Sequence, residues 1–78
     1  MDYVLYQRIT CPYCRKVLRY MEQTGIQLPM RDTTDPEVLA ELVALGGKAQ
    51  VPCLMINGKA LYESDDIIAY LQEHLADQ

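Results

Sequence analysis

The stretch ITCPYCRK, residues 9–16, decides how the first half of the chain folds. Pro12 suits the first turn of a helix, where its missing N–H group leaves no hydrogen bond unmade. Apolar residues then recur at the three- and four-residue spacing of a helix face, at Cys14, Val17, Leu18 and Met21. Gly25 is a typical helix end. We therefore expect a helix that begins beside Cys11 and ends before Gly25.

Two strands and a second helix are expected around this first helix. Residues 2–7 (DYVLYQ) form a short apolar segment rich in strand formers, and residues 26–31 (IQLPMR) predict a second strand. Asp35 followed by Pro36 predicts the N-cap and first residue of another helix, with a Thr34–Glu37 capping box as the alternative. The glycine pair at residues 46–47 predicts its end.

The last third of the chain predicts a hairpin and a closing helix. Residues 51–56 (VPCLMI) form an apolar segment, and Asn57-Gly58 is a strong two-residue turn signal before a returning strand over residues 59–62. Ser64 is expected to cap the final helix. The order β-α-β-α-β-β-α predicts an α/β domain in which helices flank a mixed four-stranded sheet. We expect one domain over residues 1–78.

Composition excludes several classes of protein. Half of the 78 residues are hydrophobic, which is enough for one small core, so disorder is not expected. The net charge of −4 argues against general nucleic-acid binding. No apolar run approaches the ~18 residues that a membrane span needs. Residues 1–10 do not resemble a secretory signal, so we expect a cytoplasmic protein.

The cysteine pair is expected to carry redox chemistry. Three cysteines are too few for a disulfide scaffold, and a Cys-x-x-Cys pair in a reducing compartment is more often catalytic or metal-binding. A helix N-terminus and nearby cations can lower a thiol pKa to somewhere in ~3.5–7.5. Cys11 has both, because Arg8, Arg15 and Lys16 lie close in sequence. Cys14 lies deeper in the helix, which predicts an attacking Cys11 and a resolving Cys14.

Metal binding is the main alternative for this pair. A structural zinc site needs four ligands, and the chain adds only Cys53 and His74 as further candidates. We expect Cys53 to be a buried strand residue and His74 to be exposed, and hence no metal site. An iron–sulfur cluster shared between two copies of the chain stays open as a second alternative.

The motifs together resemble those of glutaredoxins. The resemblance rests on TCPYC at residues 10–14, Val51-Pro52, and the SDD turn at residues 64–66, in this order along essentially the whole chain. It implies a thioredoxin-like fold, glutathione as co-substrate, and a cis Val51-Pro52 peptide that faces the cysteine motif. One departure is Tyr62-Glu63, which stands where glutaredoxins typically carry a glycine pair.

A second resemblance is to the N-terminal domain of glutathione transferases. It rests on residues 50–54 (QVPCL) and 61–64 (LYES), whose Glu-Ser pair holds the γ-glutamyl end of glutathione in that family. Larger two-domain glutaredoxins combine both patterns. Ser64 at a helix N-terminus would suit a carboxylate of glutathione, and Glu63 or Asp65 its ammonium group. The residues expected to bind glutathione are Arg8, Tyr13, Lys48, Gln50, Val51, Pro52, Glu63, Ser64 and Asp65.

These observations predict a glutathione-dependent thiol–disulfide oxidoreductase, with Cys11 as nucleophile and Cys14 as resolving cysteine. Its partners would be glutathione and disulfide-containing or glutathionylated proteins, with no nucleic acid and no membrane, and we expect a monomer. Three alternatives stay open: a stand-alone glutathione-binding domain like that of the transferases, an iron–sulfur cluster carrier, and a thioredoxin-like protein recharged by a reductase.

Overall fold

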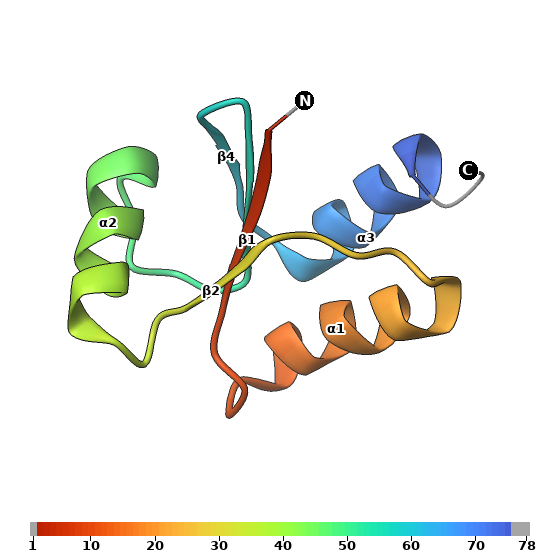
Figure 1. The fold of residues 1–78 in the computed structure, drawn as a ribbon, viewed down its shortest axis with the longest axis horizontal. Coiled ribbons are helices and arrows are strands. Elements are labelled where there is room, and N and C mark those ends of the chain that lie inside the picture. Colours follow the sequence, from red (N-terminus) through yellow and green to blue (C-terminus); the bar gives the residue numbers. More distant parts are fainter. Residues whose placement is uncertain (1, 76–78) are drawn as a thin grey trace.

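The computed structural model of the protein describes residues 2–75. Its elements, in order, are β1 (Tyr3–Gln7), α1 (Pro12–Thr24), β2 (Met30–Asp32), α2 (Pro36–Gly46), β3 (Cys53–Ile56), β4 (Lys59–Leu61) and α3 (Ser64–His74). The strands form one mixed sheet in the order β2-β1-β3-β4, with β1 and β2 parallel and the other pairs antiparallel (Figure 1). This confirms the order β-α-β-α-β-β-α and the four-stranded sheet predicted from the sequence.

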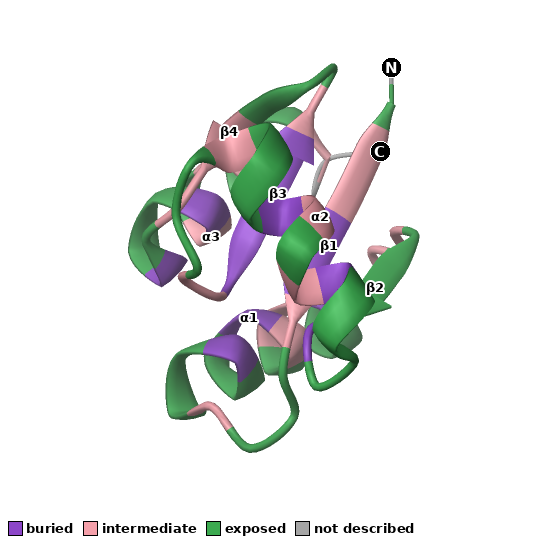
Figure 2. Cartoon of the chain, turned by 90° about the vertical axis from the view of Figure 1, so that its left-hand side faces the viewer, coloured by how far each residue is buried: buried purple, intermediate pink, exposed green. Residues whose placement is uncertain are grey.

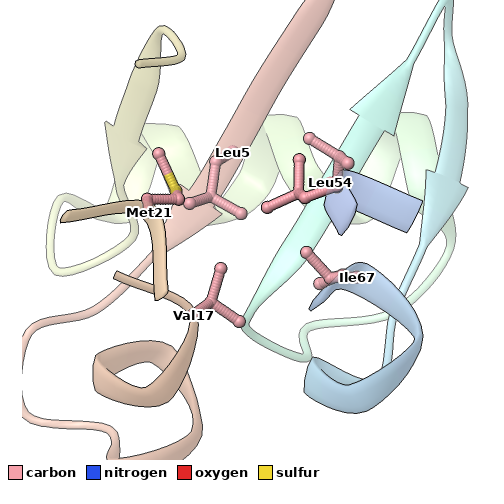
Figure 3. Close-up of a cluster of buried hydrophobic side chains, with 6 residues drawn as sticks. Leu5, Val17, Met21, Leu54 and Ile67 are labelled. Atoms are coloured by element: carbon pink, nitrogen blue, oxygen red, sulfur yellow. The ribbon is translucent and has the colours of Figure 1, made fainter. Parts of the chain in front are cut away.

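The helices lie on both faces of the sheet. In Figure 1, α1 and α3 lie together on one side and α2 on the other. Leu5 of β1 pairs with Leu54 of β3, and both point toward α1 and α3 (Figure 3). The first core cluster consists of Leu5, Val17, Met21, Leu54, Ile67 and Leu71.

The opposite face of the sheet carries a second core. Tyr6 and Cys53, each one residue along from the Leu5–Leu54 pair, face α2, because successive side chains of a strand alternate between faces. With Val38, Leu42 and Met55 they form the second core cluster. In Figure 2 the buried segments lie where strands and helices meet, while much of the outer helix surface is exposed.

The ends of the first two helices follow from local sequence chemistry. Gly25 ends α1 with φ 75°, a left-handed conformation that costs glycine little, and its N–H donates to the Met21 carbonyl. Asp35 begins α2 by accepting a 2.9 Å hydrogen bond from the Glu37 N–H. The Asp35 cap, and not the Thr34–Glu37 capping box, is therefore the one that forms.

The strands at residues 26–31, 51–56 and 59–62 are shorter than expected. β2 includes only Met30–Asp32, because Pro29 lacks an N–H group and Ile26 and Leu28 pack against the first core cluster instead of extending the strand. β3 begins at Cys53, two residues later than predicted, and β4 ends at Leu61. No helix within residues 2–75 is long and apolar enough to cross a membrane.

Candidate functional site

Cys11 lies at the N-terminus of α1, as the sequence predicts. It is the N-cap residue, with φ −87° and ψ 123°, and its N–H donates to the Arg8 carbonyl at 3.0 Å. Its half-buried Sγ lies 3.9 Å from the carbonyl oxygen of Val51, and the Val51-Pro52 peptide is cis. The fold therefore brings two loops 40 residues apart in sequence together at one sulfur atom.

The two cysteines of the motif have opposite acidities. Partial burial raises the pKa of Cys11, but hydrogen bonds from Cys14 and Tyr13 and the charge of Arg8 outweigh it and leave that pKa below the ordinary value of a thiol. Cys14 is fully buried, and burial raises its pKa to about 11 although the Arg8 N–H donates to its Sγ at 3.4 Å. Cys11 is thus the more readily ionised and the more accessible thiol.

A groove of about 350 Å³ lies beside Cys11. Its volume falls within the ~300–1,000 Å³ that is typical of small-molecule sites. Its lining residues come from the start of α1, the loop before β3 and the start of α3, and are Tyr13, Gln50, Val51, Pro52, Glu63, Ser64 and Asp65. The structure therefore brings together all the residues expected to bind glutathione, apart from Arg8 and Lys48.

Arg8 and Lys48 are placed differently from the groove residues. Arg8 precedes Cys11 in the loop after β1, where its N–H contacts Cys14 and its charge lowers the pKa of Cys11. The ammonium group of Lys48 lies 5.3 Å from the ring centre of Tyr62, a cation–π contact. Neither side chain lines the groove.

The polar side chains of the groove are partly paired with one another. The Gln50 side-chain amide donates to a Glu63 carboxylate oxygen at 3.3 Å. Asp65 forms an ion pair with Lys16 of α1. Glu63 is thus held only by a neutral amide among the described residues, which leaves its charge less neutralised than that of Asp65.

The start of α3 differs from the prediction by one residue. Glu63 is the N-cap, with φ 21°, and Ser64 is the first residue of the helix, so the prediction that Ser64 is the cap is wrong. No side chain caps α3, and the first N–H groups of a helix have no intrahelical partner. Ser64 is buried and lines the groove at this end of the helix.

Tyr62 has a structural role that no sequence pattern indicated. Its hydroxyl donates to the Lys48 carbonyl and accepts from the Lys48 N–H, both at 3.2 Å. A Cβ on Gly46 would lie 2.2 Å from this hydroxyl, so only glycine allows the approach. The sequence predicts only a helix end at residues 46–47, whereas the structure shows that Gly46 also leaves room for the Tyr62 hydroxyl, which bonds to the backbone of Lys48 in the loop that leads to the groove.

Neither Cys53 nor His74 lines the groove. Cys53 is fully buried in the second core cluster, as expected, and burial raises its pKa to about 11. His74 is exposed and its ring lies 4.3 Å from that of Tyr70. Within residues 2–75, no group of three or more Cys, His, Asp or Glu side chains could hold a metal ion.

A Cys-x-x-Cys pair at the start of α1, opposite a cis-proline loop on a β2-β1-β3-β4 sheet, defines a protein of the thioredoxin fold. Comparison with known families assigns the chain to one family within this fold. Residues 5–78 match the family "Glutathione S-transferase, N-terminal domain", and the chain belongs to that family. The expected thioredoxin-like fold is thereby confirmed, and the chain is glutaredoxin-like within it.

Individual relatives come from both families that the motifs resemble. The chain is 33% identical to Glutaredoxin-C4 of Arabidopsis thaliana in an alignment 78 positions long, which covers 94% of this chain and 58% of that protein. It thus spans little more than half of that curated relative. A Bombyx mori unclassified glutathione S-transferase superposes with a TM-score of 0.84 at 23% identity, over 100% of this chain and 38% of that one. The glutaredoxin in a buckwheat glutaredoxin–glutathione complex superposes with a TM-score of 0.71 at 21% identity, over 92% of this chain and 69% of that one.

Proposed function

We propose that the protein is a glutathione-dependent thiol–disulfide oxidoreductase of the glutaredoxin type, with Cys11 as its nucleophile. The observation that carries the proposal is the position of Cys11: its thiol has a lowered pKa and lies 3.9 Å from the carbonyl oxygen of Val51, a residue that lines the groove. A sulfur held against Val51 would therefore lie next to the thiolate. The likeness to glutaredoxins, one of them complexed with glutathione, supports the choice of ligand.

The reaction is a sequence of two thiol–disulfide exchanges. The Cys11 thiolate attacks the glutathione sulfur of a mixed disulfide; a Cys11–glutathione disulfide forms, and the substrate leaves as a thiolate that takes up a proton. The thiolate of a second glutathione then attacks the sulfur of the bound glutathione. Oxidised glutathione leaves and the Cys11 thiolate is restored, so each turnover consumes one free glutathione, which leaves joined to the glutathione that came from the substrate.

The groove residues divide the recognition of glutathione between them. Ser64 and the free N–H groups at the start of α3 suit the γ-glutamyl carboxylate. Glu63 is better placed than Asp65 to pair with the ammonium group, because Asp65 is already engaged by Lys16. The backbone of Val51 would bind the cysteinyl unit as an extended strand. Gln50, whose amide contacts Glu63, would lie at the γ-glutamyl end of the molecule.

Cys14 enters only when the substrate is a protein disulfide. After Cys11 has attacked such a disulfide, the Cys14 thiolate displaces the partner and leaves a Cys11–Cys14 disulfide, which glutathione reduces. Burial disfavours the Cys14 thiolate, so we expect attack by free glutathione to be the faster route when glutathione is abundant. A reducing compartment such as the cytoplasm, which keeps both thiols reduced, is the setting that this chemistry requires.

A coupled assay with glutathione, glutathione reductase and NADPH tests the proposal on a small glutathione mixed disulfide. We expect NADPH consumption by the wild type, none by Cys11→Ser, and most of the wild-type rate from Cys14→Ser. Cys53→Ser is the matched control, because its buried thiol faces the other core. Equal loss in the Cys11 and Cys14 variants would exclude the one-cysteine route.

The family match favours one second candidate, transfer of glutathione to an electrophile. A standard aryl halide in the same buffer distinguishes it. Rapid conjugation without disulfide reduction would replace the proposed function by transferase activity.

A further inference from the structure

A larger hollow lies between α1 and α3, on the other side of the Lys16–Asp65 ion pair from the glutathione groove. Its volume is about 540 Å³. Lys16 lines this hollow whereas Asp65 lines the groove, so the ion pair lies between the two. The lining runs from Pro12 along α1 through Arg15, Lys16, Arg19 and Gln23, with Ile68 contributed by α3. Pro12, the residue after Cys11, lies at one end of this lining.

The hollow carries positive charge on a protein whose net charge is −4. Lys16 is largely neutralised by Asp65. Arg15 and Arg19 are exposed, and neither forms an ion pair within residues 2–75. Two unpaired guanidinium groups are therefore available to a ligand in this hollow.

The fold does not explain these two arginines. Positions 15 and 19 are one helical turn apart, where like charges destabilise a helix by a few tenths of a kcal/mol. Arg15 also lies near the start of α1, whose first turn contains no acidic residue, so the positive end of the helix dipole is not offset. Two cations that weaken their own helix and bind nothing within it point to a partner outside the chain.

We propose that this hollow, the Arg15–Arg19 groove, binds an acidic segment of the protein substrate next to its reacting cysteine; the proposal rests on the oxidoreductase function above. The helix rises ~1.5 Å per residue, which places Arg15 ~6 Å and Arg19 ~12 Å from Cys11 along the axis. An extended peptide advances ~3.3 Å per residue. Acidic side chains two and four positions from the substrate cysteine therefore match the two arginines.

The surroundings of Cys11 favour a polypeptide over other anions. Ile9 and Tyr13, on either side of Cys11 in sequence, are 67% and 64% exposed and offer apolar contact to a chain lying over the thiol. Nucleic acids and anionic membranes need a broad basic surface, whereas only two unpaired cations are available here. An acidic peptide needs only those two charge contacts and the apolar contact with Ile9 and Tyr13.

Two glutathionylated peptides test the docking step. One carries glutamate at the second and fourth positions on each side of the cysteine, and the other carries glutamine at the same positions. At low salt we expect kcat/KM to be about three- to tenfold higher for the acidic peptide, since each exposed ion pair contributes modestly. The preference shrinks as the ionic strength approaches ~1 M, where the Debye length is ~3 Å.

Single-charge variants locate the effect. Arg19→Gln should lose much of the preference for the acidic peptide while reducing the glutamine peptide at the wild-type rate. Lys59→Gln is the matched control, because it also removes one exposed positive charge but lies on β4 and should keep the preference. Equal kcat/KM for both peptides, or equal losses in both variants, would overturn the docking proposal and leave the oxidoreductase function standing.

A binding measurement separates docking from chemistry. An acidic peptide with serine in place of cysteine is titrated into the ¹⁵N-labelled protein. We expect the amide shifts to change along residues 15–23 of α1, and the glutamine counterpart to cause none of these changes. Such shifts without turnover of any mixed disulfide would support the groove and reject the oxidoreductase function, whereas their absence would reject the groove.

Discussion

Alkylation of the three cysteines should separate Cys11 from Cys14 and Cys53. At pH 7 a thiol with a pKa of about 11, such as Cys14 or Cys53, is ~0.01% ionised. The pKa of Cys11 lies below that of an ordinary thiol, because hydrogen bonds from Cys14 and Tyr13 and the charge of Arg8 stabilise its thiolate. Even an ordinary thiol, with a pKa of ~8.5, is ionised more than ~100-fold more than a thiol of pKa about 11, and the lowered pKa of Cys11 adds to this difference.

Intrinsic nucleophilicity opposes this difference only in part. With a Brønsted slope of ~0.4–0.5, a thiolate whose pKa is ~2 units higher reacts ~10-fold faster once it is formed. The net advantage of Cys11 from ionisation is therefore ~10-fold or more. Accessibility increases the reactivity advantage of Cys11 further, because Cys14 and Cys53 are both fully buried and Cys11 is not.

The assay is timed treatment with iodoacetamide at pH 7, followed by trypsin and mass spectrometry. Cleavage after Arg8 and Arg15 leaves both motif cysteines in one peptide, residues 9–15, and fragmentation locates the label. We expect single labelling at Cys11 at early times, and labelling of all three cysteines at similar rates in denaturant. The pH midpoint of the labelling rate at Cys11 should lie below that of an ordinary thiol, because its pKa is lowered. Labelling of Cys14 as fast as Cys11 would refute the assigned asymmetry.

Two further predictions concern the loops around the groove. Gly46→Ala should lower the free energy of unfolding in urea by about 1–3 kcal/mol, because the new Cβ would overlap the Tyr62 hydroxyl. Adding Tyr62→Phe should cost less than the sum of the two single changes, and strict additivity would argue against the contact. Ser64→Ala should raise the KM for glutathione about three- to tenfold with little change in kcat, through loss of one hydrogen bond to the carboxylate. Its melting temperature should stay near the wild-type value, because Glu63 and not Ser64 is the N-cap; a loss of the ~1 kcal/mol typical of a removed cap would contradict that assignment.

Local signals in the sequence predicted most of the fold. Pro12 and Gly25 mark the two ends of α1, and Asp35 marks the start of α2, because each acts through its own backbone or its near neighbours. The prediction of a strand from residue 26 begins four residues before β2 does. Ile26 and Leu28 are apolar for a different reason, because they cover the first core cluster. Periodicity cannot separate these two uses of apolar residues.

The site was predictable where a motif fixed it and not where side chains from distant elements meet. Val51 and Ser64 both line the groove, as expected from the two family motifs in which they occur. The position of Lys48 depends on the ring of Tyr62, 14 residues later, and no local pattern encodes that contact. The Arg15–Arg19 groove likewise exists only because α3 packs beside α1. Its sequence signal was the cluster of cations after Cys11.

The burial of Cys14 makes the supply of glutathione the factor that selects the route of the proposed enzyme. Once a protein is joined to Cys11, two processes compete: capture by a free glutathione, whose rate rises with concentration, and closure by Cys14, whose rate does not. Because burial disfavours the Cys14 thiolate, we expect capture by glutathione to be the faster process when glutathione is abundant. When glutathione is depleted, closure takes over and releases a trapped partner. Cys14 would then limit the lifetime of mixed disulfides under oxidative stress.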